Sequence, residues 1–120
     1  MNTTFARVAS QLPGQVAEQL LELGFSISFE QEDNFEYLSA TSAHTKDEKI
    51  YFLAFDPVAT NAYLFFNTLQ LLNNTGASCH IVVEGAGERY LIFNILEMQE
   101  ITGVEVWCVE RLRDYPLQVI

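Results

Sequence analysis

The segment from Pro57 to Val83 contains no Asp, Glu, Lys or Arg, and this constrains the fold more than any other feature of the chain. A helix at a protein surface normally carries charged side chains on its outer side. We therefore expect the helix in this segment to be covered on more than one side. An outer side bare to solvent in a single protomer would contradict this expectation, and the case for a partner-binding assembly that rests on it would collapse.

Both ends of this helix are marked in the sequence. Asp56 can accept hydrogen bonds from the free N–H groups of a first turn, and Pro57 suits the first helical position because its missing donor costs nothing there. Gly76 can adopt the left-handed conformation that ends a helix. Apolar side chains recur at spacings of three and four, which predicts a helix over residues 56–76. The recurring residues are Val58, Ala62, Phe65, Leu69 and Leu72.

The remaining sequence alternates between helical and strand patterns. Apolar spacing predicts a helix over residues 13–23, and residues 104–110 fit either a strand or a helix, with their density of valine favouring a strand. We expect an α+β fold with an antiparallel sheet of about six strands and the helices on one face. The predicted strands cover residues 25–30, 35–41, 50–55, 80–84, 89–96 and 104–110.

The two halves of the chain follow the same expected order of elements. In each half a helix and a glycine precede a strand, a turn, a second strand, a loop and a third strand. A duplicated αβββ unit would produce this order, and so would the ordinary arrangement of an α+β domain. In both cases we expect a single domain over residues 1–120, because a chain of this length can bury a core without disulfides or a metal.

The predicted strand over residues 50–55 is apolar on both of its faces. A strand of this kind is covered on both sides. With helices on one face of the sheet only, Tyr51, Leu53 and Phe55 need another cover. A second protomer is the simplest one, so these three residues are predicted to form an apolar interface in a homodimer.

Sixteen acidic residues against six basic residues give the chain a formal net charge of −10. Such a surface repels phosphate backbones, which argues against direct nucleic-acid binding and favours a basic protein partner. Acidic charge that only confers solubility is the alternative. Acidic residues gather around one predicted hairpin, where they either contact Lys or Arg of a partner or form a solvated turn. They are Glu30, Glu32, Asp33 and Glu36.

The sequence shows no sign of membrane insertion or secretion. No apolar run approaches the ~20 residues that span a bilayer. The N-terminal segment MNTTFARVAS lacks the apolar stretch of a secretory signal. We therefore expect a cytoplasmic protein without membrane association, in which Cys79 and Cys108 stay reduced.

Residue types that carry chemistry do not form a recognisable motif in this sequence. Cys79, His80, Cys108 and His44 could bind a metal, but they lack the paired ligand spacing of a zinc site. The segment Gly85-Ala86-Gly87 resembles a phosphate-binding loop, but a predicted strand follows it instead of a helix. We interpret this segment as a hairpin turn, and we expect no catalytic residue, metal or other cofactor.

The order of helix, three strands, uncharged helix and further strands resembles the type III secretion chaperone fold. The local similarity covers the middle of the chain, where a helix ending in asparagine and glycine precedes a predicted hairpin, in the sequence LFFNTLQLLNNTGASCHIVVEGAGERYLIF. That family comprises small acidic cytosolic dimers that bind an unfolded segment of an effector, so the resemblance implies a chaperone-like dimer. The family ends in a helix, whereas residues 104–110 favour a strand here, and no individual residue is carried over.

Two classes of function follow from these patterns. The first is a small, acidic, non-catalytic protein-binding module, chaperone-like or inhibitor- or immunity-like, that acts as a homo-oligomer. The alternative is a small-ligand-binding protein or an enzyme, with a pocket between the helix over residues 56–76 and the sheet. The residues predicted to line that pocket are Tyr63, Phe65, Phe66, His80 and Trp107.

Overall fold

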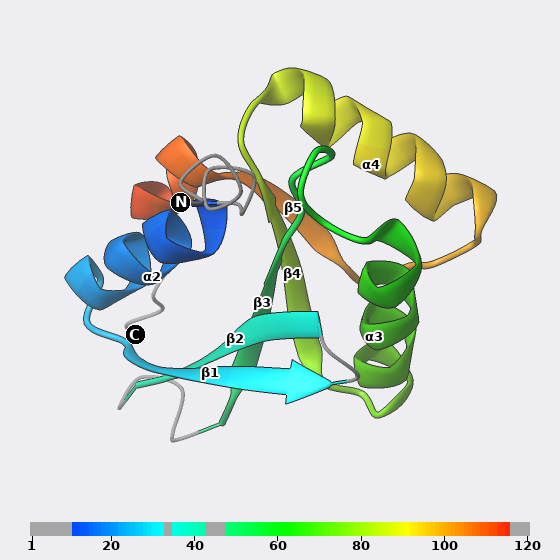
Figure 1. Ribbon diagram of the computed structural model, residues 1–120. Helices are drawn as coiled ribbons and strands as arrows, with labels where there is room; N and C mark the ends of the chain where they lie inside the picture. Colours follow the sequence, from blue (N-terminus) through cyan, green and yellow to red (C-terminus); the bar gives the residue numbers. More distant parts are fainter. Residues whose placement is uncertain (1–10, 33–34, 43–47, 116–120) are drawn as a thin grey trace, which may run out of the picture.

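The computed structural model describes residues 11–32, 35–42 and 48–115. The described chain forms one open sheet of five strands with helices packed against it (Figure 1). The helices are α2 (Leu12–Glu22), α3 (Ala62–Asn74), α4 (Ala86–Met98) and the 3-10 helix η2 (Val109–Asp114). The strands are β1 (Ser26–Glu32), β2 (Phe35–Thr41), β3 (Ile50–Ala54), β4 (Ser78–Val83) and β5 (Glu105–Cys108).

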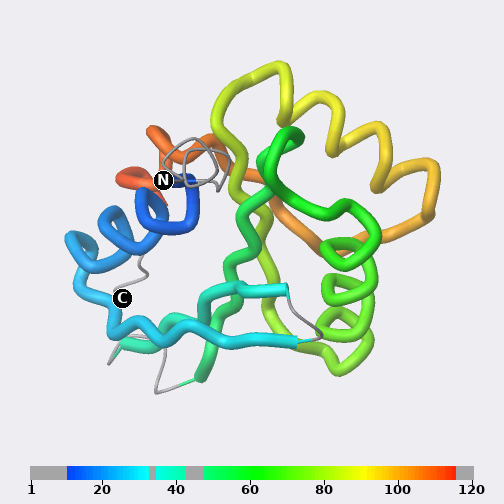
Figure 2. Tube along the Cα trace, viewed as in Figure 1, coloured from blue at the N-terminus to red at the C-terminus, as the bar shows by residue number. Residues whose placement is uncertain are grey.

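The five strands lie in the sheet in the order of the sequence. β1, β2 and β3 pair antiparallel, whereas β3–β4 and β4–β5 pair parallel. Parallel neighbours need a long crossover, and α3 and α4 are the two crossovers (Figure 2). The register aligns Leu38, Phe52, His80 and Glu105 in one row from β2 to β5. Segments far apart in sequence therefore become neighbours on the sheet.

The α+β class is confirmed, but the predicted antiparallel sheet of about six strands is wrong. The sheet is mixed, and it has five strands because residues 89–96 belong to α4. Ile92 and Leu96 are the buried residues of this helix, while Tyr90, Leu91 and Phe93 are exposed. These exposed apolar side chains hide the helical period that the two buried residues follow. The second half of the chain is thus not a second αβββ unit.

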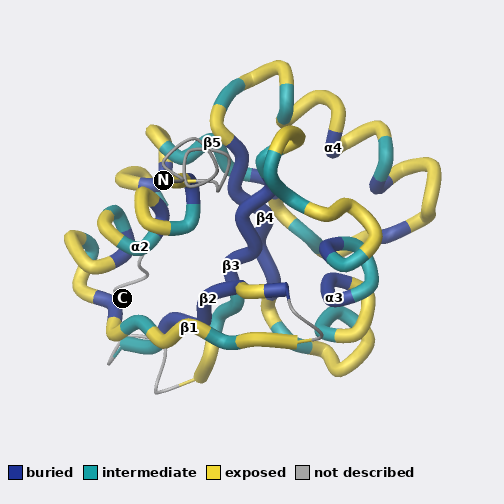
Figure 3. The backbone as a smooth tube through the Cα atoms, viewed as in Figure 1, coloured by how far each residue is buried: buried dark blue, intermediate teal, exposed yellow. Residues whose placement is uncertain are grey.

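Helices cover both faces of the sheet, so the prediction of helices on one face is also wrong. α3 and α4 pack on one face and α2 and η2 on the other, and β3 and β4 lie buried between them (Figure 3). On the first face Phe65 and Leu69 of α3 and Ile92 of α4 contact the core of Leu53 and Ile81. The second face has its own core. It contains Leu12, Val16, Leu20, Phe25, Leu38, Ala40, Phe52, Ala54, Val82 and Leu112.

The uncharged helix begins later than predicted. Asp56 does not cap it, because the Asp56 carboxylate accepts from the N–H of Val58 at 2.9 Å within a turn that precedes the helix. Asn61 is the cap, and its side-chain oxygen accepts from the N–H of Leu64 at 3.0 Å. At the other end Gly76 has a φ of +81°, which agrees with its predicted place just beyond the helix.

The ambiguous segment 104–110 is divided between two elements. β5 occupies Glu105–Cys108 at the edge of the sheet, and η2 follows at once from Val109. η2 packs beside α2, and its buried residue Leu112 joins the core of that face. The strand favoured by the valines is therefore present but short.

Candidate functional site

A groove of about 890 Å³ follows the edge strand β5. α4 borders it with Ala86, Arg89 and Phe93, and η2 borders it from the other side. No strand among the described residues pairs with the outer edge of β5. The groove therefore combines an open strand edge with side chains from both helical layers, which makes it a candidate binding site.

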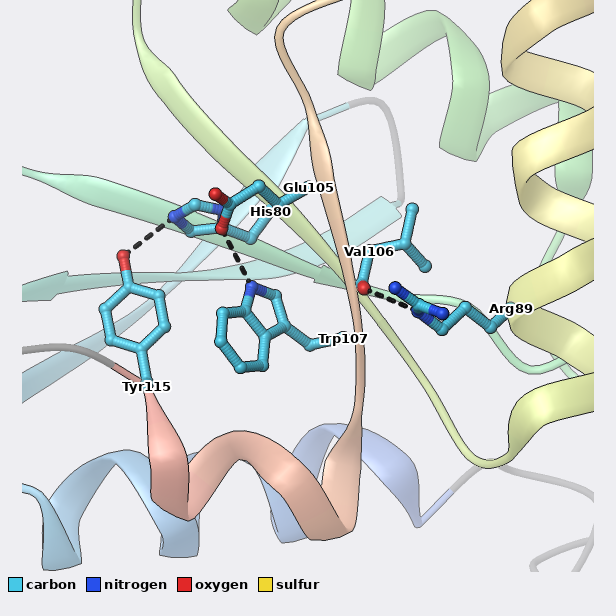
Figure 4. Close-up of polar contacts among 6 residues, drawn as sticks. All are labelled: His80, Arg89, Glu105, Val106, Trp107 and Tyr115. Carbon is cyan, nitrogen blue, oxygen red and sulfur yellow. Dashed lines mark hydrogen bonds and ion pairs between the residues drawn. The ribbon is translucent and has the colours of Figure 1, made fainter.

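Arg89 connects the α4 side of the groove to the edge strand. Its Nε donates to the carbonyl oxygen of Val106 at 3.0 Å (Figure 4). Its guanidinium carbon lies 4.8 Å from the centroid of the Phe93 ring. The crossover from β4 through α4 to β5 places the first turns of α4 beside β5, so the topology creates these contacts. Arg89 thus occupies a backbone acceptor of the edge strand.

A polar cluster lies on the face of the sheet that α2 and η2 cover (Figure 4). The Nε2 of His80 is 2.8 Å from the hydroxyl of Tyr115. On β5, the Nε1 of Trp107 donates to Glu105 Oε1 at 3.0 Å. The same carboxylate oxygen lies 3.5 Å from Nδ1 of His80. The strand register explains the cluster, because His80 lies beside Glu105 and Val82 lies beside Trp107.

Burial controls the charge of this cluster. Desolvation lowers the pKa of His80, and the carboxylate of Glu105 opposes that shift in part. Desolvation, with a further contribution from Glu105, raises the pKa of Tyr115 to about 12. His80 is therefore neutral near pH 7, and its buried Nδ1 has no hydrogen-bond partner among the described residues. The 3.5 Å contact between His80 and Glu105 becomes an ion pair only when the imidazole is protonated.

Tyr115, His80 and Glu105 contact one another in the spatial order of a nucleophile, a base and an orienting acid. The environment of Tyr115 argues against that role. Its ring packs edge-on against Phe25 and Phe52 at centroid distances of 6.1 and 5.6 Å, and its pKa is raised rather than lowered. Neither Tyr115 nor His80 lines the groove at β5. We interpret the cluster as a partly buried link between β4 and the end of η2.

The five residues predicted to line one pocket do not come together. Phe65 is fully buried in the α3 layer, where its ring packs against Phe35 at 5.7 Å and Phe55 at 4.9 Å. Tyr63 is 77% exposed on the outer side of α3. The other three are Phe66, which packs with Phe65, and His80 and Trp107, which lie on the opposite face of the sheet. The interface of α3 with the sheet is filled by aromatic rings.

The predicted apolar interface of Tyr51, Leu53 and Phe55 is covered within the chain. Leu53 and Phe55 are buried in the core beneath α3, and Tyr51 packs against Tyr37 at a centroid distance of 5.8 Å. The strand is apolar on both faces because its own helices cover both faces. It needs no second protomer, and Leu53 and Phe55 are not available to a partner, while Tyr51 is partly buried.

The predicted acidic cluster is only partly described. Glu30 Oε2 accepts from the hydroxyl of Ser39 at 2.8 Å and lies 3.5 Å from Nζ of Lys49. Glu32 and Glu36 are exposed near the end of the β1–β2 hairpin. Asp33 lies outside the described residues. Glu30 is thus engaged within the sheet, while Glu32 and Glu36 contribute negative charge to the surface.

The candidate metal ligands are not assembled either. Cys79 and His80 are adjacent on β4 and point to opposite faces, and His44 lies outside the described residues. In the described ranges, no group of three or more His, Cys, Asp or Glu residues could hold a metal ion. Burial raises the pKa of the Cys79 thiol to about 11, so this thiol stays protonated near pH 7. Cys79 behaves as a core residue.

The outer side of the uncharged helix is exposed, so the expectation of cover on more than one side is wrong within this chain. A second groove of about 530 Å³ lies between α3 and α4. Apolar side chains and amides line it, and none of the lining residues is Asp, Glu, Lys or Arg. We call this surface the α3–α4 face. It consists of Ala62, Tyr63, Phe66, Asn67, Gln70, Ile95, Met98 and Gln99.

Sequence reasoning missed both grooves for the same reason. The β5 groove needs α4 beside β5, and the α3–α4 face needs two helices side by side, whereas residues 89–96 were assigned to a strand. The glycine at position 85, which begins α4, was the available signal. Comparison with protein-family models, curated proteins and solved structures gives no match for this chain. Among the described helices, none has the length and apolar character needed to cross a membrane.

Proposed function

We propose that this protein is a small, non-catalytic protein-binding module that acts as a homodimer and binds a basic partner. The observation that carries the proposal is the α3–α4 face, which combines apolar side chains with uncharged amides on a chain with a net charge of −10. Exposed apolar surface of this kind is typical of contact sites between proteins. The outer side of α3 is bare to solvent in this protomer, so the case made from a covered helix has collapsed, and the proposal rests on the exposed face instead.

Charge favours a second copy as the occupant of this face. A twofold dimer brings the same surface of two subunits together, so any carboxylate near the axis would approach its own copy. The lining of the α3–α4 face has no carboxylate. The linings of two copies that each carry −10 can therefore meet without opposing like charges within the groove. Tyr63, Phe66 and Met98 supply the aromatic and methionine side chains that are enriched at the centres of interfaces.

The surface outside this face suits a cationic partner. Glu18 and Glu22 are exposed on α2, and Glu32 and Glu36 are exposed at the β1–β2 hairpin. A surface of this sign speeds encounter with a basic protein and disfavours an acidic one. Chaperone-like and inhibitor- or immunity-like roles both fit such a module. The hairpin that carried the local resemblance to type III secretion chaperones is replaced by α4, so that resemblance does not choose between the two roles.

A small-ligand-binding protein is the second candidate, and one observation favours it. The β5 groove, at about 890 Å³, has the size of many ligand pockets. The predicted position between α3 and the sheet does not favour it, because Phe65 fills that interface against Phe35 and Phe55. The titratable pair His80 and Tyr115 does not line the groove. The protein-binding proposal therefore accounts for more of the structure.

Light scattering of the wild-type chain and two matched variants tests the proposal. At low micromolar concentration we expect the wild type to have about twice the mass of the 13.6 kDa chain. Tyr63→Glu places a carboxylate on the α3–α4 face and should give the mass of a monomer. Gln15→Glu makes the same charge change on exposed α2 and should stay dimeric. A monomeric wild type, or equal dissociation of both variants, would overturn the assignment of this face.

A further inference from the structure

The outer edge of β5 has what strand addition requires. β5 ends the sheet, and no strand of the described chain pairs with its outer side. The groove of about 890 Å³ runs along this edge between α4 and η2. A peptide that adds a strand obtains its affinity from main-chain hydrogen bonds, and the side chains that flank the edge select its sequence.

Arg89 closes this edge in the structure. Its Nε donates to the Val106 carbonyl at 3.0 Å, and that carbonyl is a backbone acceptor of the edge strand. Charged side chains are a common means by which proteins protect an edge strand from pairing. Arg89 is exposed and held by this bond and by the Phe93 ring at 4.8 Å, so it can leave without unpacking the core. Removing Arg89 should therefore open the site.

The groove also indicates the sign of its ligand. Its lining contains Glu105, Glu110 and Asp114 against Arg89 and Arg111. Asp114 pairs with Arg111 at 3.3 Å, and Arg89 is engaged at Val106. Glu105 accepts from Nε1 of Trp107 at 3.0 Å through Oε1, but its side chain is still 63% exposed, and Glu110 is exposed as well. Carboxylates beside η2 therefore face an incoming strand, while Phe93 offers an apolar surface beside α4.

We propose that the outer edge of β5 binds an extended cationic segment of a partner protein by strand addition, and that Arg89 keeps this edge closed in the free protein. Alternate residues of the segment would place basic side chains toward Glu105 and Glu110 and apolar side chains toward Phe93. A second copy of β5 is the less favourable occupant, because it would bring the same three carboxylates and a net charge of −10 to the groove. This inference rests on the proposed function only for the charge of the partner.

Trp107 is the only tryptophan of the chain and it lines the groove, so its fluorescence reports occupancy without a label. The probe is a capped peptide of alternating valine and lysine, about six residues long, which is the common length of a strand. We expect a saturable change in Trp107 emission as this peptide is added to the full chain. A peptide of alternating valine and glutamate should produce no change at the same concentrations.

Two N-methylated versions of the probe test the hydrogen bonds. One carries methyl groups on the valine amides and the other on the lysine amides, so each removes the donors of one edge. Loss of about two main-chain bonds should weaken at least one version by about tenfold. If both versions bind as tightly as the parent peptide, the contact is electrostatic only and strand addition is excluded.

Two arginine variants test the closing role of Arg89. Arg89→Ala should tighten binding of the valine–lysine peptide about three- to tenfold, because a backbone acceptor is freed. Arg113→Ala makes the same charge change at an exposed position of η2 outside the groove lining, and should alter affinity less than about twofold. Equal effects of the two variants would leave charge as the only cause and overturn the proposal. Circular dichroism confirms that both variants fold.

Mass measurements separate this inference from the dimer. The Tyr63→Glu chain should bind the peptide as tightly as wild type, because the α3–α4 face lies away from the β5 lining. If Arg89→Ala instead raises the mass of the chain without peptide, a second copy occupies the edge and the inference fails, while the dimer on the α3–α4 face is decided separately by Tyr63→Glu. If the peptide binds but the wild-type chain is monomeric, the proposed dimer fails and this inference stands.

Discussion

The two helical layers that cover the sheet have similar inner sides and different outer sides. Each inner side is apolar and closes one core of the sheet. The outer side of α2 and η2 is charged, with Glu18, Glu22, Glu110, Arg111, Arg113 and Asp114 exposed. The outer side of α3 carries no charged residue, and Tyr63 there is 77% exposed. A layer with a charged outer side covers the sheet equally well. Covering the sheet therefore does not require the outer side of α3 to lack charge.

α4 lies in the same layer and exposes apolar side chains beside the charged residues Arg89 and Glu97. Tyr90 is 71% exposed and Met98 is 81% exposed, although the helix buries only Ile92 and Leu96. Met98 of α4 lines one groove together with Tyr63 and Phe66 of α3, so exposed apolar side chains of the two helices meet in a surface that a second chain can cover. The layer of α2 and η2 has the charged surface of an ordinary solvated face. We therefore place the contact between subunits on the α3–α4 face and not on the other layer.

The largest expected effect is the loss of unfolding free energy when the inner side of either layer is changed, because each inner side closes one core. Phe65→Ala in α3 and Leu20→Ala in α2 each remove a fully buried side chain. Each should lower the free energy of unfolding by about 2–5 kcal/mol, measured by urea denaturation. Tyr63→Ala, measured at a concentration where the chain is monomeric, should change it by less than about 0.5 kcal/mol. A similar loss for Tyr63→Ala would mean that the outer side of α3 stabilises the single chain.

Salt should change the two proposed contacts in opposite directions. Two subunits with a charge of −10 repel each other at long range, so screening should tighten the dimer. The valine–lysine peptide is attracted to the carboxylates at β5, so the same increase should weaken its binding. Between 0.05 and 0.5 M sodium chloride we expect changes of about threefold to tenfold in the two dissociation constants. Sedimentation and Trp107 fluorescence measure them, and changes of the same sign would contradict the assignment of the faces.

The buried histidine should make the free energy of unfolding depend on pH. The pKa of His80 is lowered in the folded chain, so the unfolded chain binds more protons as the pH falls below about 6.5. The contribution of His80 to stability is therefore present above that pH and is lost on acidification. The loss cannot exceed about 1.4 kcal/mol per pH unit for one proton. Urea denaturation between pH 7 and pH 5 measures it.

Two variants identify the group that titrates. His80→Gln removes the imidazole and should flatten the dependence of stability on pH in this range. Glu105→Gln removes the carboxylate that opposes the lowered pKa of His80, so it should make the dependence steeper. A dependence that is unchanged in His80→Gln would assign the titration to other groups.

The smallest effect expected is at the start of the uncharged helix. Asn61→Ala removes the side-chain acceptor for the N–H of Leu64 and should cost about 1 kcal/mol of unfolding free energy. Asp56→Ala should cost less, because Asp56 accepts from Val58 in the preceding turn and not from the helix. Chemical denaturation of the two variants checks the order. A larger loss for Asp56→Ala would restore the longer helix predicted from sequence.

Local patterns predicted most of the individual elements. The strands near residues 26–32, 35–41, 50–54 and 78–83 and the helix ending before Gly76 follow from alternation, helical spacing and a terminal glycine. The pattern failed at residues 89–96, where Tyr90, Leu91 and Phe93 are apolar and exposed. The period of a helix is visible only when its outer side is polar. An apolar contact surface removed that signal.

The candidate sites were less predictable because they depend on topology. The sequence predicted that His80 and Trp107 share a pocket with Phe65. In the structure they lie on the opposite face of the sheet from Phe65. Once residues 86–98 are a helix, β4 and β5 become parallel and α4 lies beside β5. Arg89 then reaches Val106 across a sequence separation of 17 residues. Alternation and spacing carry no information about contacts at that range.

The most direct test of the account is a distance between the two subunits of the dimer. A nitroxide is attached at Asn67→Cys on the α3–α4 face or, in a matched chain, at Gln15→Cys on exposed α2, each with Cys108→Ser to remove the partly exposed native thiol. Pulsed electron resonance then measures the distance between labels on the two subunits. The account predicts a shorter distance for position 67 than for position 15. A shorter distance for position 15, or no coupling between subunits at either position, would contradict it.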